Sequence, residues 1–428
     1  MATNNQIPSN WTIAKFEDLL DYIQPTEYIV ESTEYDDKYK TPVLTAGKSF
    51  IKGYTNETTG IFNELPVIIF DDFTTATQFV NFPFKVKSSA MKILQPTSEL
   101  VNIKLLFYYM QTVHLKSETH KRYWISEYSK LPIPLPPHKE QQRILEKIEE
   151  LFTVLDKGIE YLEAAERQLI IYRQALLKKV LEGNWELKPL GEITEVKRGK
   201  SKHRPRDAKE LYGGKYPFVQ TGDVKAANGG TIKTYSQTYS EIGLMQSKLW
   251  PKGTLCMTIA ANIADTAFLG FDGCFPDSVV GIKANEEEVS LKFINFYIQK
   301  LKQEISSKAS ATAQKNINVE FLDKLLIPFP SFKEQNKIAN EIESRFSICD
   351  KIVETIENSL LQAEALRLSI LKNAFEGKLV KQNPKDVSAE ILLAKIRAEI
   401  NRKYPDKPEK KIKTKKYVSH RTTASYEL

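Results

Sequence analysis

The chain has 428 residues, of which 41% are hydrophobic and 27% are charged, and its formal net charge is +7. These values predict a globular protein of two or three domains whose positive charge suits a polyanionic partner. No apolar run approaches the ~20 residues of a membrane span, no secretory pattern opens the sequence, and the three cysteines form no C-x-x-C pair, so we expect a cytoplasmic protein without membrane contact, zinc or a disulfide framework.

The first predicted domain comprises residues 1 to 132 and begins its strands after Trp11. Runs at residues 67 to 70 and 85 to 94 predict strands, and residues 103 to 112 predict a helix. An acidic pair at residues 71 and 72 could chelate a metal, but a single pair without further ligands is more often a turn or a base-reading element. Basic and polar residues in the loops ahead of these strands, and just before the domain ends, are the candidates for DNA contact: Thr45, Lys48, Lys52, Lys121 and Arg122.

The first spacer helix region is predicted at residues 133 to 184. It opens with I-P-L-P-P-H-K-E-Q, whose prolines favour an extended entry, and a helix from His138 to Glu182 would be about 65 Å long at ~1.5 Å per residue. Gly183 occupies the position of a helix-ending glycine. Apolar positions recur at alternating steps of four and three, which predicts a coiled-coil seam at Ile144, Ile148, Leu151, Leu155, Gly158, Leu162, Ala165, Leu169, Tyr172 and Leu176.

The second predicted domain comprises residues 185 to 326 and is entered by Trp185. Strands are predicted at residues 216 to 220, 254 to 259 and 279 to 282, and a helix at residues 291 to 303. Lysines and arginines in its loops would hold phosphates, while Gln220, Asn262, Gln314 and Asn316 could read base edges. A solvated or loop-capping role is an equal alternative for each candidate: Lys197, Arg198, Lys200, Lys202, Arg204, Gln220, Thr221, Asp223, Asn262, Gln314, Lys315 and Asn316.

The second spacer helix region, residues 327 to 383, repeats the first at an offset of 194 residues, beginning with I-P-F-P-S-F-K-E-Q. Ser331 and Glu334 form a capping-box pattern, and Gly377 corresponds to Gly183. We expect the two helices to pair as an antiparallel coiled coil, although each could instead pack on its own domain. The second seam is predicted at Ile338, Ile342, Arg345, Cys349, Ile352, Ile356, Ser359, Ala363, Leu366 and Ile370.

The last segment, residues 384 to 428, contains a short amphipathic helix at residues 388 to 402, which is a candidate for partner binding. The lysine-rich stretch at residues 403 to 416 is expected to be disordered. It would either add nonspecific DNA affinity or keep the protein in solution.

Motifs for catalysis are missing from the sequence. It has neither the N-P-P-Y-like tetrad of an amino-methyltransferase nor a cofactor-binding G-x-G-x-x-G after a strand, and it lacks a phosphate-binding G-x-x-x-x-G-K-[ST] loop. We therefore expect no catalytic residue, metal ligand or cofactor in this chain. A self-contained nuclease or methyltransferase, active with a metal or S-adenosylmethionine, and a coiled-coil scaffold without DNA specificity are the alternatives.

Two dissimilar segments, each followed by an I-P-x-P-x-x-K-E-Q helix, resemble the specificity subunits of type I restriction-modification enzymes over nearly the whole chain. Residues 41 to 94 and 216 to 224 look like two recognisable versions of the family's recognition domain. The resemblance implies an α+β protein in which two α/β target-recognition domains are separated by two long antiparallel helices, with a pseudo-twofold internal repeat.

The resemblance also implies the partners. Each recognition domain would read one half of a split double-stranded DNA target, and the helices would space the two domains and dock two DNA-adenine methyltransferase subunits. Restriction and translocase subunits would complete an enzyme that uses S-adenosylmethionine, ATP and Mg²⁺. An equivalent reader that serves a fused methyltransferase-nuclease partner is the closest alternative.

Overall fold

The computed structural model describes residues 7–47, 49–113, 115, 122–202, 205–310 and 317–403, without the side chains of residues 308–310. The chain forms two compact units. Unit 1 contains residues up to Glu160 and from Leu360 onward, and unit 2 contains Tyr161–Ser359. The division falls within the two long helices, so the domain limits expected from the repeat stay predictions.

The sheets of unit 1 have the orders β2-β8-β5-β6, β4-β3-β7 and β1-β9. In β5 alternate side chains face opposite cores: Ile68 and Phe70 pack with Phe16, and Ile69 packs with Phe84, as the period of a strand requires. The strands are β1 (Thr12–Lys15), β2 (Leu20–Ile23), β3 (Thr41–Leu44), β4 (Ile51–Thr55), β5 (Val67–Asp71), β6 (Thr77–Val80), β7 (Lys85–Val86), β8 (Met91–Pro96) and β9 (Pro132–Leu135). The short helices are α1 (Phe16–Leu19), η1 (Pro25–Tyr28), α2 (Ile103–Met110), α3 (Tyr123–Ser126) and η2 (Tyr128–Lys130).

The main sheet of unit 2 has the order β11-β17-β15-β16-β13, and β12-β14 and β10-β18 form separate pairs. Its first four strands follow the order of the four-stranded sheet in unit 1. The strands are β10 (Leu187–Pro189), β11 (Glu195–Arg198), β12 (Tyr212–Phe218), β13 (Thr231–Ile232), β14 (Gln237–Tyr239), β15 (Leu255–Thr258), β16 (Thr266–Leu269), β17 (Val279–Lys283) and β18 (Leu326–Pro328). The helices are α5 (Leu190–Ile193), η3 (Lys209–Leu211), α6 (Thr221–Ala227), α7 (Glu241–Met245), α8 (Leu291–Ser310) and α9 (Val319–Asp323).

The repeated proline motif joins each domain to a long helix, α4 (His138–Val180) or α10 (Phe332–Phe375). The buried glutamine of each motif turns back on its own strand: Gln141 Nε2 donates to the Pro136 carbonyl (2.9 Å) and Gln335 Nε2 to the Pro330 carbonyl (3.0 Å). The same side chain therefore secures the strand-to-helix turn in both repeats.

The helix ends are built differently in the two repeats. The Ser331 hydroxyl accepts the Glu334 N–H (3.3 Å), as a capping box requires. Gly377 follows α10 with φ +72, as expected for a helix-ending glycine. The corresponding prediction for Gly183 is wrong, because α4 ends at Val180 and the Leu181 carbonyl accepts a hydrogen bond from Lys300 Nζ of α8 (3.1 Å).

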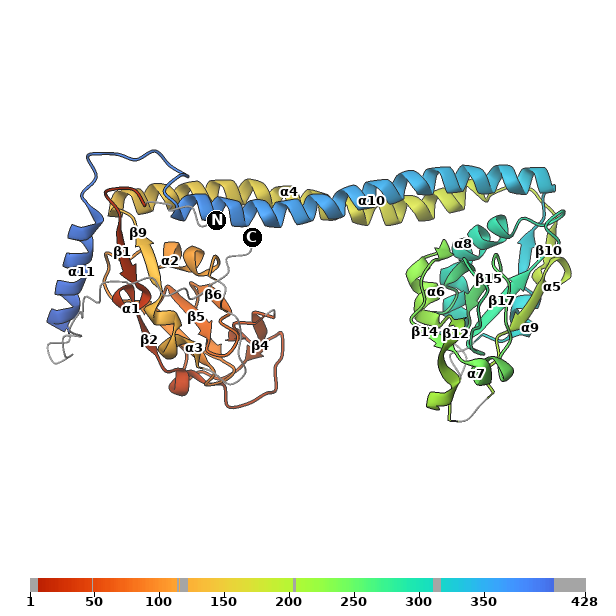
Figure 1. Ribbon diagram of the computed structural model, residues 1–428, viewed down its shortest axis with the longest axis horizontal. Helices are drawn as coiled ribbons and strands as arrows, with labels where there is room; N and C mark the ends of the chain where they lie inside the picture. The colour runs from red at the N-terminus through yellow and green to blue at the C-terminus, as the bar shows by residue number, and fades with distance from the viewer. Residues whose placement is uncertain are drawn as a thin grey trace. The chain divides into compact units, whose positions relative to one another are not determined.

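The expected antiparallel pairing of α4 and α10 is confirmed within each unit (Figure 1). In unit 1 the first part of α4, with Ile144 and Ile148, packs against the last part of α10, with Ile370. In unit 2 the end of α4, with Leu177, packs against Ile342 near the start of α10. Both helices bury one side against each other, which favours a coiled coil over packing on separate domains.

Six of the twenty predicted seam positions are exposed and therefore wrong: Gly158, Ala165, Tyr172, Arg345, Ile352 and Leu366. Tyr172, Ile352 and Leu366, all assigned to the seam, are 44%, 41% and 51% exposed. Positions one residue later than predicted are buried or partly buried, and they include Phe152, Ile159, Phe346, Val353 and Leu360. Three of these later positions are Glu166, Arg173 and Arg367, whose charges hid the true phase in the sequence.

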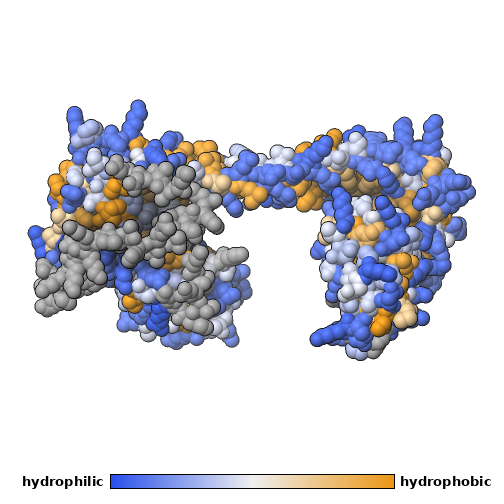
Figure 2. Space-filling view, viewed as in Figure 1, coloured by the Kyte–Doolittle hydropathy of each residue, from blue (hydrophilic) through white to orange (hydrophobic). Residues whose placement is uncertain are grey.

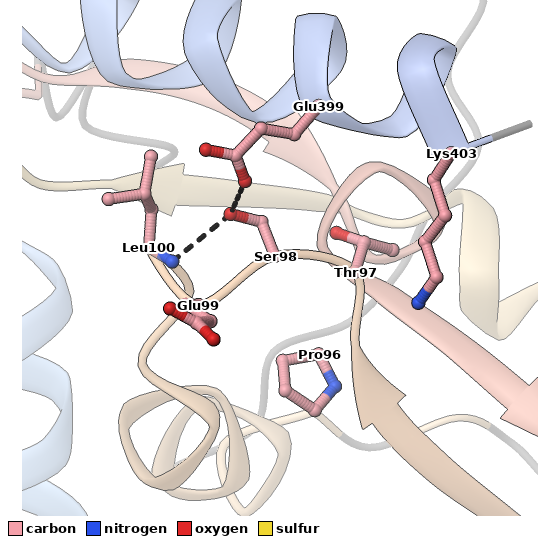
Figure 3. A pocket seen from close by; sticks show the side chains of 7 residues that line it. All are labelled: Pro96, Thr97, Ser98, Glu99, Leu100, Glu399 and Lys403. Atoms are coloured by element: carbon pink, nitrogen blue, oxygen red, sulfur yellow. Dashed lines mark hydrogen bonds between the residues drawn. The ribbon is translucent and has the colours of Figure 1, made fainter.

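The C-terminal helix α11 (Ala389–Lys403) packs on unit 1. Its buried Leu392, Leu393 and Ile396 join the core around Phe16. The Ser98 hydroxyl donates to Glu399 (Figure 3), so helix and domain are also joined by a polar contact beside a cavity of about 500 Å³. The apolar face that we considered for a partner is thus covered by the chain itself. Within the described ranges, no helix is long and apolar enough to cross a membrane.

Candidate nucleic-acid interface

Six of the predicted DNA-binding residues lie outside the described residues, so their roles stay predictions: Lys48, Lys121, Arg204, Gln314, Lys315 and Asn316.

The three described candidates of unit 1 lie on separate elements. The Thr45 hydroxyl donates to the Ser49 carbonyl (2.9 Å) and accepts the Gly47 N–H (3.3 Å), which makes it part of the turn after β3. Lys52 on β4 and Arg122 before α3 are exposed. Their charged groups are available for phosphates, whereas the Thr45 hydroxyl is already used.

The acidic pair of unit 1 has a structural role. Asp71 accepts the Phe73 and Thr74 N–H groups (2.9 Å each) in a turn. Asp72 is buried, accepts the Trp124 N–H (2.8 Å) and pairs with buried Lys92 (3.5 Å). No group of three or more histidines, cysteines or acids in the described part of the chain is arranged to hold a metal ion.

Several candidates of unit 2 meet at one end of the main sheet. Arg198 is the last residue of β11. The residues that follow it lie beside the start of β17, and the Lys200 N–H donates to the Phe275 carbonyl (3.2 Å). Thr258 at the end of β15 pairs with Val279 of β17. The loop with Asn262, which follows Thr258, therefore lies at the same sheet end as Arg198 and Lys200.

The Asn262 loop is a tight turn with an unusual backbone. Ala261, Asn262 and Ala264 have φ values of +46, +46 and +66, each of which costs about 1–3 kcal/mol in a residue other than glycine. The Thr258 hydroxyl donates to the Asn262 carbonyl (2.5 Å), and the Asn262 side chain is exposed. A fixed backbone with an outward amide is a suitable arrangement for hydrogen bonds to a base edge.

Gln220, Thr221 and Asp223 are not brought to this sheet end. We expected a loop there, but these residues begin helix α6. Asp223 accepts the Gln220 N–H (2.8 Å) as a helix cap, and Gln220 Nε2 donates to Gln237 (2.6 Å). The other end of α6 reaches the sheet end, where the Gly229 N–H donates to the Thr266 carbonyl (2.8 Å).

Lys248 and Lys283, which we did not select from the sequence, lie on the same side of unit 2 as Lys197 and Lys200. Burial lowers the pKa of the Lys248 ammonium, the positive charges of Lys283, Lys197 and Lys200 lower it further, and Glu195 raises it. Lys248, two residues before Trp250, could have been noticed as a candidate in the sequence. Lys283 could not, because the other residues of its strand are typical of a buried core.

The cysteines are poorly suited to nucleophilic chemistry. Cys256, Cys274 and Cys349 are free and buried, and burial raises the pKa of the Cys256 and Cys274 thiols. A raised pKa disfavours the reactive thiolate.

Comparisons with known proteins agree with this architecture. The family model for the type I restriction modification DNA specificity domain matches residues 8–163 and 182–362, one match for each half of the repeat. The specificity subunit of the Escherichia coli type I restriction enzyme EcoR124I/EcoR124II is 31% identical over 384 residues, covering 83% of this chain and 89% of that protein.

Two solved structures share the fold. A chain of a type I R-M system has a TM-score of 0.68 at 16% identity and covers 87% of this chain and 99% of its own length. The HsdS subunit from Thermoanaerobacter tengcongensis has a TM-score of 0.50 at 16% identity, with coverages of 87% and 98%. Because the family model matches both halves of the repeat, the chain belongs to the family of type I restriction-modification specificity subunits, and its function is DNA-sequence specificity.

Proposed function

We propose that each domain reads one half of a split, asymmetric DNA target and that the paired helices set the distance between the halves. This proposal rests on one observation: the two domains repeat the same backbone architecture but carry different residues on their surfaces. Both domains have the same order of four sheet strands and the same proline motif, whereas their candidate contact residues differ. Two similar frames with unlike surfaces suit two unlike half-sites.

Exposed apolar residues on the long helices support the docking of two similar partners. In unit 1, Val154 and Leu366 are 67% and 51% exposed, and in unit 2 their repeat equivalents Ile348 and Tyr172 are 58% and 44% exposed. Hydrophobic residues interrupt the polar surface along the helices (Figure 2). Exposed apolar groups at equivalent positions favour one kind of partner bound twice, which fits two DNA-adenine methyltransferase subunits.

The chemistry of the complex belongs, in this proposal, to the partners. The methyltransferase subunits would use S-adenosylmethionine, and restriction and translocase subunits would use ATP and Mg²⁺, in the cytoplasm. This chain would be noncatalytic and hold each methyltransferase over an adenine in one half-site. A fused methyltransferase-nuclease partner is not favoured, because the matched relatives are named as type I specificity subunits.

Sequencing of methylated adenines in cells that contain this chain and its methyltransferase partner tests the proposal. We expect one motif with two specified halves and an unspecified spacer, and no methylation in cells with the chain alone. A contiguous motif, or methylation by the chain alone, would contradict it.

A doubly extended variant tests the spacing. One heptad inserted after Leu162 and another after Ile356 would keep both seams in phase and add roughly 10 Å of helix. The half-sites should stay the same while the spacer grows by up to about three base pairs, since each pair rises ~3.4 Å. An active variant that methylates the original spacing would show that the helices do not set the distance.

A further inference from the structure

Trp250 lies at the centre of a lysine cluster in unit 2. The ammonium of Lys248 lies 3.9 Å from the centre of the indole and that of Lys283 lies 5.3 Å from it. The ring covers β17 at Gly281, where a Cβ atom would come within 2.6 Å of the ring. Glycine at this position therefore lets the ring lie flat on the strand, with both lysines over it.

Strand pairing adds Lys197 to the same face. Lys197 on β11 pairs with Gly281, and Glu195, two residues earlier, pairs with Lys283. Cross-strand partners, and residues two apart in one strand, point to the same side of a sheet. Lys197, Lys283 and the Trp250 ring therefore share one face at the β11 edge of the sheet.

Lys200 is held beside this face by the loop that follows β11. Its carbonyl accepts the Ser247 hydroxyl (2.8 Å), next to Lys248, and its N–H donates to Phe275 (3.2 Å). The Phe275 ring stacks on Trp250 with centres 4.9 Å apart. Four lysines from three separate stretches of the sequence are thus held around one aromatic pair by backbone and ring contacts.

The cluster has little compensating negative charge. Among the described residues, its one ion pair joins Lys197 to Glu195, and Lys248 and Lys283 form none. Both unpaired lysines are partly buried, so water screens their mutual repulsion less than at an open surface. An anion placed between them would relieve this repulsion, and a phosphate is the anion that a DNA specificity subunit meets.

We propose that Lys197, Lys200, Lys248 and Lys283 bind consecutive backbone phosphates of the DNA duplex beside the Asn262 loop. This inference rests on the function proposed above and adds the phosphate-binding residues of the second domain. Lys200 links the cluster to the sheet end that carries Asn262, so phosphate contacts would orient the duplex for base contacts. The alternative role is structural: Lys197 on the edge strand β11 would prevent pairing with another sheet, and Lys248 and Lys283 would only pack on the Trp250 ring. The experiment separates phosphate binding from these roles.

The test is the double variant Lys248→Gln/Lys283→Gln in the full chain, assembled with its methyltransferase subunits. Affinity is measured against salt for a duplex with the methylated motif and for a duplex without it. Removing two phosphate contacts should lower the slope of log affinity against log salt by about two units for both duplexes. The methylated motif should not change, because phosphates carry no sequence information.

Matched variants control for charge and for folding. Lys292→Gln/Lys324→Gln removes the same charge from lysines that pair with Glu343 and Glu320 (2.7 Å each), and it should leave the slope unchanged. Lys248→Arg/Lys283→Arg keeps the charge and should keep the slope. If the glutamine pair unfolds in a thermal melt, Lys200→Gln replaces it, with an expected loss of about one unit.

An unchanged slope in the folded glutamine variant would overturn the inference and leave packing on the Trp250 ring as the role of Lys248 and Lys283. An equal loss in the Lys292/Lys324 control, or weaker binding to one duplex only, would also overturn it. If the wild-type complex showed no sequence preference, the proposed function would fail, while the slope on the nonspecific duplex would still decide the role of the lysines.

Discussion

The two recognition domains share a backbone frame and differ in what their side chains do with it. The Tyr123 N–H donates to the Asp72 carbonyl in unit 1, and the Ile317 N–H donates to the Ile259 carbonyl in unit 2, both at 3.0 Å. The two donors are 194 residues apart, the offset of the repeat. In each unit this bond ties the segment before the proline motif to the residue after a central strand.

The side chains at these positions are unlike. In unit 1 the Asp72 carboxylate accepts a second N–H and pairs with buried Lys92, which donates to Gln24 (2.5 Å). In unit 2 the places of Asp72 and Lys92 are held by Ile259 and by Val280 of β17, both buried and apolar. Backbone hydrogen bonds hold the frame, so the side chains of a recognition domain can change without changing the fold.

The long helices show the opposite behaviour, because they repeat side-chain contacts as well. Arg367 pairs with Asp156 and lies 4.3 Å from the centre of the Phe152 ring in unit 1. Arg173 pairs with Asp350 at 2.5 Å and lies 4.9 Å from the Phe346 ring in unit 2. All three residues of each arginine clamp are related by the offset of 194, so the helix pairing repeats its side-chain contacts as well as its backbone.

The largest effect should come from replacing a whole recognition domain. If the frames are equivalent and the surfaces independent, exchanging residues 11 to 132 for the same segment of another family member should change one half-site and leave the other. Sequencing of methylated adenines measures both halves at once. A change in both halves would show that the domains do not read independently.

The motif glutamines should differ in their contribution to stability. Besides the proline carbonyl, Gln335 accepts the buried Ser290 N–H (2.9 Å) and donates to the Glu288 carbonyl (3.3 Å). A buried polar group left unpaired costs about 1–3 kcal/mol. Gln335→Met should therefore lower the free energy of unfolding more than Gln141→Met, as measured by urea unfolding with hydrogen exchange for each unit. Equal losses would mean that the extra bonds of Gln335 contribute little.

The two arginine clamps should be equivalent. Their ion pairs are partly exposed, so each clamp is worth about 1 kcal/mol from the ion pair and the cation–π contact together. Arg367→Gln and Arg173→Gln should each lower stability by about this amount, and thermal unfolding of double-mutant cycles with Asp156→Asn and Asp350→Asn gives the coupling. A coupling in one unit only would contradict the symmetry of the helix pair.

The smallest effect concerns Glu140, which is buried in unit 1 and accepts Gln382 Nε2 (2.5 Å). Burial raises its pKa above the ordinary 4.5, so the folded chain binds more protons than the unfolded chain, and stability falls as pH rises past that value. Glu140→Gln should raise the melting temperature slightly at neutral pH, with the gain shrinking toward pH 4.5. The control is Glu334→Gln at the exposed repeat position, and a pH-independent gain would sink the explanation.

The sequence by itself determined the repeat, the two-domain organisation, the antiparallel helices and the family. These features were readable because a heptad pattern and a repeated proline motif are local in the sequence, and local patterns keep their meaning before the chain folds. The exposed basic residues after β11 were also predictable, since charge in a loop is visible without a structure.

The seam phase, the packing of α11 on unit 1 and the lysine cluster at Trp250 could not be predicted, because each depends on contacts between residues far apart in the chain. The capping role of Asp223 is a local contact with Gln220, but it required knowing that a helix begins there. Arg173 and Arg367 occupy the seam because a phenylalanine and an aspartate of the facing helix accept them. Lys283 joins Lys197 only because β17 pairs with β11, and such a pairing is determined by the free energy of the whole sheet and not by either strand alone.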